Sequence, residues 1–203
     1  MSEIKLDMAQ TFGIPVVKVK NAYRVSDNEL NYIKNLPFRQ RRNAKISDDL
    51  FILNKDSILN NLKKVINECS AKFIREIICV DNDFQMTNSW IARSDSVHSK
   101  HNHVNTIFSV VYYVQADDAT LRFHREKNFV TESLYCDLSY KSFNHFNSTN
   151  MNFEVSTGDI MIFPGYILHE GINHSQNEKI ILGANYFIRG DVGKYNNVTS
   201  LII

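Results

Sequence analysis

This chain of 203 residues has few cysteines, few prolines and almost no excess of charge. The cysteines, Cys69, Cys79 and Cys136, lie far apart and form no Cys-x-x-Cys pair, which argues against a disulfide framework and against a thiolate zinc site. The net charge of +1 removes the usual electrostatic reason to expect a nucleic-acid partner. We therefore expect one domain, residues 1–203, in a reducing, cytoplasmic setting.

Long hydrophobic runs are also missing. No apolar stretch approaches the roughly 20 residues that a membrane-spanning helix needs, and the first seven residues lack the apolar core of a secretory signal. We expect no membrane partner. One local basic run, Arg39–Arg42 followed by Lys45, stands out in the N-terminal third, and we interpret it as a solvated loop or helix end.

The N-terminal part has the patterns of one strand and two helices. Apolar and polar residues alternate over Phe12–Val19, around a proline that suits a strand edge. Ser26–Glu29 has the spacing of a capping box, and Pro37 ends the helical pattern that follows. A long apolar stripe with a period near 3.6 runs over Ile58–Ile77. These patterns predict a helical front, about residues 20–80, that covers a sheet.

From about residue 84 the pattern changes to short runs of period two. These predict strands over 86–92, 107–115, 119–124, 152–155, 159–163 and 179–187. Several such strands separated by turn residues are typical of a β-sandwich or barrel, so residues 84–190 are the expected core.

One stretch within this core, residues 127–150, shows no hydrophobic period. It contains Tyr135, Tyr140, Phe143 and Phe146, and it is either a lid over a site or a surface loop that buries its own aromatic rings.

The most specific chemical feature is His101-Asn-His103, followed much later by His169. Side chains at i and i+2 of a strand project to the same face, so both imidazoles can reach one metal ion. A histidine from a second strand would complete the site. Imidazole suits iron, zinc, copper and nickel, and two histidines with a carboxylate are typical of non-heme Fe(II) oxygenases. The position for that carboxylate, two residues after the first ligand, holds His103, or Asn105 if His103 is the first ligand.

The segment Gly158–Pro164 makes this pattern more specific. Gly158 and Asp159 form a tight turn, an apolar strand follows, and Pro164 ends it shortly before His169. Lys179 comes ten residues after His169, at the start of another apolar strand. A buried cation there could pair with the carboxylate of an acidic cosubstrate.

With these residues the chain resembles the iron- and 2-oxoglutarate-dependent oxygenases, in particular a group of bacterial and phage hydroxylases. The resemblance covers nearly the full length and rests on several blocks: Phe12–Pro15, Asn88–Trp90, His101–Asn105, Ser109–Val114, Gly158–Pro164, His169 and the strand that ends in Asn185. It implies a mainly β fold in which a double-stranded β-helix, the jelly-roll or cupin-like core, is supported by N-terminal helices.

The resemblance also implies a site. His101, His103 and His169 would hold Fe(II), with no further catalytic residues beyond these metal ligands. Lys179 would pair with the distal carboxylate of 2-oxoglutarate and Tyr113 would hydrogen-bond to it, with Asn185 as a third cosubstrate-binding residue. The candidates for the substrate pocket are Trp90, Arg93 and Asn105.

The function implied is a dioxygenase that uses Fe(II), 2-oxoglutarate and O2 to hydroxylate a small molecule or a protein side chain, with release of succinate and CO2. Two alternatives stay open: a three-histidine cupin-type metalloenzyme that does not use 2-oxoglutarate, and a non-catalytic β-helix binding module. We expect a cytoplasmic protein of a bacterium or of a phage-infected host, with a nucleic-acid partner disfavoured and an oligomer compatible with the sequence.

Overall fold

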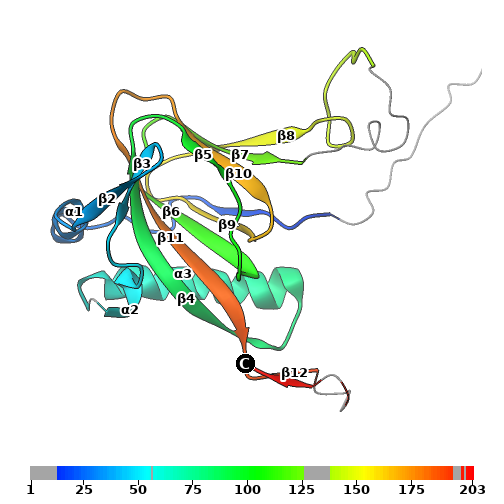
Figure 1. The fold of residues 1–203 in the computed structure, drawn as a ribbon, viewed down its shortest axis with the longest axis horizontal. Helices are drawn as coiled ribbons and strands as arrows, with labels where there is room; N and C mark the ends of the chain where they lie inside the picture. Colours follow the sequence, from blue (N-terminus) through cyan, green and yellow to red (C-terminus); the bar gives the residue numbers. More distant parts are fainter. Residues whose placement is uncertain (1–12, 56, 126–137, 194–197, 199) are drawn as a thin grey trace, which may run out of the picture.

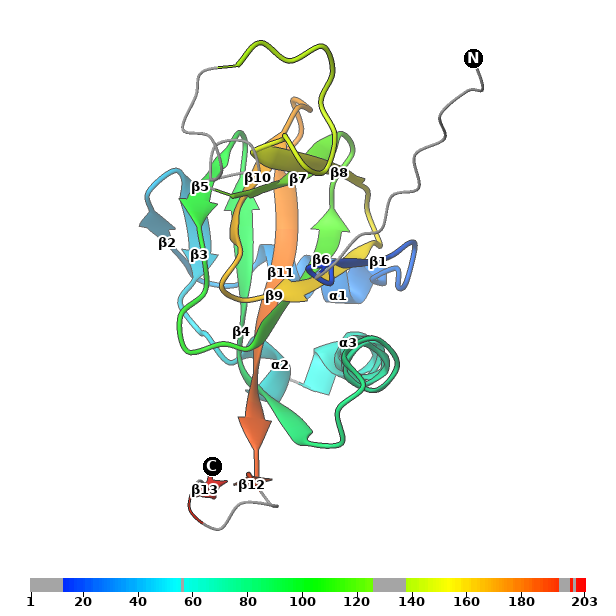
Figure 2. The same ribbon diagram turned by 90° about the vertical axis from the view of Figure 1, so that its right-hand side faces the viewer.

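Two β-sheets face each other in this protein, and helices cover the outer face of the larger sheet (Figures 1 and 2). The computed structural model describes residues 13–55, 57–125, 138–193, 198 and 200–203. The larger sheet has seven strands in the order β1-β9-β6-β11-β4-β3-β2, and the smaller has four in the order β5-β10-β7-β8. This arrangement confirms the mainly β fold with a jelly-roll core.

The strands of the larger sheet are β1 (Val17–Val19), β2 (Phe38–Arg41), β3 (Ala44–Ser47), β4 (Asp83–Ser94), β6 (Phe108–Gln115), β9 (Ile160–Pro164) and β11 (Lys179–Arg189). Those of the smaller sheet are β5 (His98–His101), β7 (Ala119–His124), β8 (Asn150–Val155) and β10 (Leu168–Asn173). A separate two-stranded ribbon consists of β12 (Asp191–Val192) and β13 (Leu201–Ile202).

The helical layer agrees with the sequence patterns. Ser26 caps α1 (Asp27–Lys34) in the predicted capping box, because its hydroxyl accepts from the Glu29 backbone while the Glu29 carboxylate accepts from the Ser26 backbone. The long amphipathic stripe forms three consecutive pieces, a 3₁₀ turn (Ser57–Leu59), α3 (Asn60–Lys72) and a π-helix (Phe73–Ile78), after the short α2 (Ile52–Lys55). Among the residues described, no helix is long and apolar enough to cross a membrane.

Each face of the larger sheet buries its own apolar cluster. The outer cluster joins α3 to the sheet through residues such as Leu62, Ile66 and Val110. The inner cluster lies between the two sheets and includes Val111 and Phe163. Adjacent residues of one strand therefore lie in different clusters, as the period-two pattern predicts. Burial of each such side chain contributes on the order of 1.5–3 kcal/mol, so both faces stabilise the sheet that carries the site.

Two segments differ from the sequence-based expectation. The basic run, interpreted above as a loop or helix end, forms β2 and the turn to β3, and β2 is an edge strand of the larger sheet. Charged residues at an edge discourage pairing with another chain, which explains how a run so polar can still be a strand. Of the expected excursion 127–150, residues 127–137, with Tyr135, lie outside the described part. Tyr140 and Phe143 contact each other, and Phe143 is 73% exposed.

Candidate active site

Three histidines converge at one end of the space between the two sheets. His101 ends β5 and pairs across the ladder with His169 of β10, so these two side chains lie on neighbouring strands. His103 follows in a loop that is held by its backbone N–H, which donates to the carbonyl oxygen of Gly165 at 2.9 Å. The potential ligand atoms of the three imidazoles lie within 4.8 Å of one another. The structure therefore brings together the three residues expected to bind a metal.

Each of these imidazoles is held through its Nδ1 atom. His101 Nδ1 lies 2.7 Å from the carbonyl oxygen of Ser99, and His169 Nδ1 lies 2.9 Å from that of Ile167. A carbonyl oxygen can only accept, so Nδ1 carries the proton and Nε2 keeps its lone pair. Metal-binding histidines commonly have such an outer partner, which sets the tautomer and the ring orientation.

The outer partner of His103 is a side chain, Asn185 of β11. Its carboxamide oxygen lies 2.6 Å from His103 Nδ1 and also accepts a hydrogen bond of 2.8 Å from the buried hydroxyl of Ser109. The resemblance assigns Asn185 to the cosubstrate. In the structure its side chain contacts His103 and Ser109, so it orients the His103 ring, and Ser109 fixes the direction of the amide oxygen.

Burial lowers the pKa of all three histidines. The pKa of His103 falls from 6.5 to about 4, mainly because the site is desolvated, and that of His169 falls well below 6.5 for the same reason. Burial is also the largest cause of the lowered pKa of His101. All three are thus neutral at pH 7, the form in which imidazole binds a metal ion.

Lys179, at the start of β11, is a buried cation with which no described residue pairs. It is 3% exposed, and its Nζ makes no hydrogen bond within the described part of the chain. Burial lowers its pKa from 10.5 to about 8. Gly171 of β10 leaves the space that the ammonium group uses, since a Cβ at that position would lie 3.0 Å from Nζ. A buried, unpaired ammonium is costly unless an anion binds beside it.

A single pocket contains the histidines and this lysine. Its lining is Trp90, His98, His101, His103, Val111, Tyr113, Leu121, His169, Gly171, Lys179 and Ile181. Tyr113 is buried, and burial raises the pKa of its phenol, so it stays protonated and able to donate. Trp90 lies against His103, with ring centroids 5.5 Å apart, and needs a glycine beneath it, because a Cβ at Gly183 would lie 2.5 Å from the indole.

Two of the expected pocket residues lie elsewhere. Arg93 follows Trp90 by three residues on β4. Because side chains alternate between the two faces of a strand, Arg93 projects from the opposite face. Its guanidinium pairs with Glu178 at 2.6 Å, and it lies over the ring of Phe38. Asn105 is in the loop after His103, has a positive φ of 54°, and does not line the pocket.

His98 is a pocket residue to which the sequence analysis assigned no role. Its ring stacks on His101 with centroids 4.9 Å apart, and burial, followed by the neighbouring His101, lowers its pKa to about 4. The separation of three residues does not suggest a shared strand face. The β5–β10 ladder shifts register between the two histidines, and this irregularity brings His98 inward. No simple sequence pattern would have revealed it.

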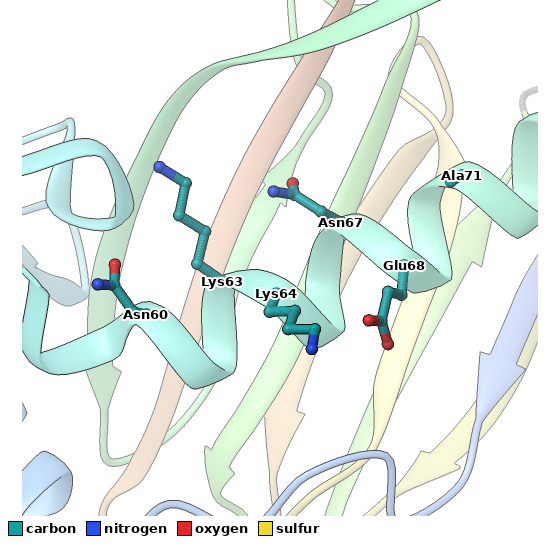
Figure 3. Close-up of a pocket in the computed structure, with 6 residues that line it drawn as sticks. All are labelled: Asn60, Lys63, Lys64, Asn67, Glu68 and Ala71. Carbon is teal, nitrogen blue, oxygen red and sulfur yellow. The ribbon is translucent and has the colours of Figure 1, made fainter.

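Another hollow lies along the exposed side of α3, on the outer layer of the molecule (Figure 3). Its lining is Asn60, Lys63, Lys64, Asn67, Glu68 and Ala71. It contains no cluster of metal-ligating side chains, and the larger sheet separates it from the histidines. Of these two hollows, the inner pocket is therefore the one that contains side chains able to bind a metal ion.

The donor set fits a first-row transition metal. The three neutral imidazoles could hold an ion with three nitrogen ligands, a number that leaves further coordination positions free, as catalytic sites require. Lys179 lies in the same pocket and pairs with no residue that the structure describes, so it fits the carboxylate of a chelating organic acid. A β-helix core with a three-histidine cluster and a buried lysine in one pocket is the arrangement expected of a metal-binding protein.

Comparison with known proteins narrows this class. Residues 88–184 match the family described as "Putative 2OG-Fe(II) oxygenase". This segment carries all the residues that line the pocket, so the match covers the whole candidate site. No match was found among curated proteins.

Solved structures share the fold at low identity. A 2OG-Fe(II) oxygenase family oxidoreductase from Burkholderia pseudomallei is 14% identical, with a TM-score of 0.57 over 84% of this chain and 83% of that one. A Pseudomonas putida prolyl-4-hydroxylase is 12% identical, with a TM-score of 0.57 over 87% and 94%. HygX from Streptomyces hygroscopicus, solved with nickel and 2-oxoglutarate bound, is 8% identical, with a TM-score of 0.57 over 85% and 82%.

Proposed function

We propose that this protein is a non-heme Fe(II)- and 2-oxoglutarate-dependent dioxygenase that hydroxylates its substrate. The observation that carries the proposal is the pairing, in one pocket, of three oriented neutral histidines with a buried unpaired cation. A metal ion alone would explain the histidines but would be repelled by Lys179. A metal chelated by a dicarboxylate explains both.

Each residue has a distinct task in this proposal. His101, His103 and His169 would hold Fe(II) through Nε2, and Asn185 would keep the His103 ring in place. When bound, Fe(II) with 2-oxoglutarate and O2 supplies the oxidation that inserts oxygen into a C–H bond and releases succinate and CO2. Lys179 would bind the distal carboxylate, and the walls of the pocket would exclude water.

Tyr113 supports the same end of the pocket. It faces the space beside Ile181 because the two residues pair across β6 and β11. Its phenol remains protonated, so it would donate a hydrogen bond to the carboxylate that Lys179 binds. Because the distal carboxylate would then have both an ionic and a hydrogen-bonding partner, we expect 2-oxoglutarate to bind more tightly than pyruvate, which lacks that group.

An anaerobic titration tests the proposal. We expect Fe(II) and 2-oxoglutarate together, and neither alone, to produce a metal-to-ligand charge-transfer absorption in the visible range. Lys179→Met is expected to abolish it at cosubstrate concentrations that saturate the wild type, whereas exposed Lys45→Met is expected to leave it unchanged. Absence of the band in the wild type would refute the use of 2-oxoglutarate and favour a three-histidine metalloenzyme of another kind.

Succinate formation separates an enzyme from a binding module. Under air, the iron-loaded protein is expected to release succinate slowly even without its substrate, as uncoupled turnover. A protein that shows the absorption band but forms no succinate would be a non-catalytic module.

The partners follow from charge and composition. We expect the substrate to be a small molecule or a protein side chain, because the net charge of +1 does not favour nucleic acid. The two described cysteines, Cys69 and Cys79, are free thiols, which fits a reducing cytoplasm. Sedimentation analysis of the purified protein would determine whether it forms an oligomer.

A further inference from the structure

The hairpin of β2 and β3 directs two arginines to the sheet face that bears the pocket. Arg39 pairs with Ile46 and Arg41 pairs with Ala44, while Ile46 also pairs with Ala92 of β4. Paired residues of an antiparallel ladder project to the same face. Arg39 and Arg41 therefore share the face of Ala92.

That face continues directly into the pocket. Trp90 precedes Ala92 by two residues on β4, so both project to the same side, and Trp90 lines the pocket. Ile181 of β11 pairs with Ala92 and also lines it. Ala44, Ile46 and Ala92 form a small buried cluster against both of these residues. The arginines stand at the edge of this surface, because β2 is the outermost strand.

The turn of the hairpin is hydrogen-bonded to β5, the strand that ends in His101, and to the residue before this strand. The Asn43 side-chain amide donates to the carbonyl oxygen of Val97, and its amide oxygen accepts from the Ser99 hydroxyl at 2.6 Å. These contacts hold the hairpin beside β5, which ends at His101.

Arg39 and Arg41 have no acidic partner within the ranges that the structure describes. Both are exposed, and neither makes an ion pair there within 4.0 Å. Arg93 and Arg122, by contrast, are each paired with a glutamate. Two residues along a strand are about 7 Å apart, a spacing at which two long guanidinium side chains can converge on one oxyanion.

The pocket itself favours an anion. None of the residues that line it is acidic, and the third histidine stands where a carboxylate would otherwise offset the metal charge. Fe(II) and protonated Lys179 together exceed the charge of the 2-oxoglutarate dianion, so one positive charge remains when the cosubstrate is bound. An anionic group nearby would be attracted by this charge and by the arginines.

We propose that Arg39 and Arg41 form a binding site for an oxyanion of the substrate, a phosphate or a carboxylate, and that the substrate is a small anionic molecule. The proposal rests on the proposed function, since it assigns a substrate class to the same pocket. The arginines would hold the charged end at the edge of this sheet face, so that an uncharged C–H bond of the same molecule reaches the histidine site.

Titration of the isotope-labelled protein, followed by amide and arginine Nε–Hε NMR signals, tests the site without turnover. The protein is first loaded with Zn(II) and N-oxalylglycine, a non-reactive analogue of 2-oxoglutarate that occupies the Lys179 end. Methylphosphonate and acetate are then added in separate titrations, to distinguish phosphate from carboxylate recognition.

We expect methylphosphonate to shift the signals of residues 38–45 and to bind at least about tenfold more weakly to the Arg39→Gln/Arg41→Gln variant, as loss of one charge-assisted contact implies. The matched control is Lys63→Gln/Lys64→Gln, which removes two positive charges from the α3 hollow of Figure 3 and is expected to bind like the wild type. If the arginine variant does not fold, the wild-type protein still tests the proposal, because methylphosphonate is expected to shift the signals of residues 38–45 there.

Several results would overturn the proposal. These are equal affinity in all three proteins, shifts scattered over every basic surface, or shifts confined to the pocket around Lys179. A single-stranded oligonucleotide that binds through Arg39 and Arg41 at least 100-fold more tightly than methylphosphonate would replace the small anion with nucleic acid. Failure of the proposed function is distinct: Zn(II) and N-oxalylglycine would then leave the pocket signals unshifted before any anion is added.

Discussion

Replacing Lys179 with methionine is expected to stabilise the apo-protein while it abolishes cosubstrate binding. Methionine keeps most of the volume and removes a charge that burial disfavours. The pKa of Lys179 falls from 10.5 to about 8 on folding, which corresponds to roughly 3 kcal/mol at about 1.36 kcal/mol for each pH unit. Lys179 makes no hydrogen bond to a described residue, so the substitution breaks no such contact.

The gain depends on pH in a defined direction. Below about pH 8 the Lys179 side chain is charged in both the folded and the unfolded protein. The folded protein then bears the full free-energy cost of burying the charged ammonium group. Between about pH 8 and 10.5 the unfolded chain holds the proton more tightly, so the stability of the wild type rises with pH. The difference between Lys179→Met and the wild type is therefore largest near pH 7 and disappears towards pH 10.5.

Urea unfolding of the metal-free proteins, followed by circular dichroism at several pH values, measures this difference. At pH 7 the variant is expected to be more stable by about 2–3 kcal/mol, or roughly 5–10 °C in Tm for a chain of this size. Exposed Lys45→Met is the control and is expected to change stability by less than about 0.5 kcal/mol. A destabilised Lys179→Met protein, or a gain that does not vary with pH, would refute the reasoning.

Three further predictions concern the same pocket. Asn185→Ala is expected to weaken metal binding by about 10- to 100-fold, measured by competition with a chelator, because His103 loses its orienting partner; unchanged affinity would contradict that role. Gly171→Ala is expected to raise the KM for 2-oxoglutarate with little effect on metal binding, since its Cβ would lie 3.0 Å from Lys179 Nζ; an unchanged KM would show that the lysine can move. Metal binding at pH 7 is expected to release fewer than one proton per ion, because the three histidines are already neutral; calorimetry in buffers of different ionisation enthalpy checks this, and release of two or three protons would contradict it.

Local patterns were sufficient for much of the fold. The capping box at Ser26 and the apolar stripe after Ile58 depend on neighbours three or four residues apart, and both helices are present. The strand over residues 119–124 has the predicted bounds. The basic run Arg39–Arg42 was wrongly interpreted as a loop or helix end, because most of it forms an edge strand. An edge strand keeps its charged side chains in solvent and so lacks the apolar alternation of a buried strand.

The sequence by itself predicted the β core, because the alternation of apolar and polar residues along a strand is a local property. The set of His101, His103 and His169 was implied by the resemblance to known oxygenases, not by local spacing alone. Only the tertiary structure decided which residues share the pocket. Pairing across strands placed Asn185 behind His103, turned Arg93 away and brought His98 inward at an irregularity of the ladder. It also left Lys179 buried without a partner among the residues that the structure describes. These outcomes depend on register and on contacts between residues far apart in the chain, and a linear pattern does not contain them.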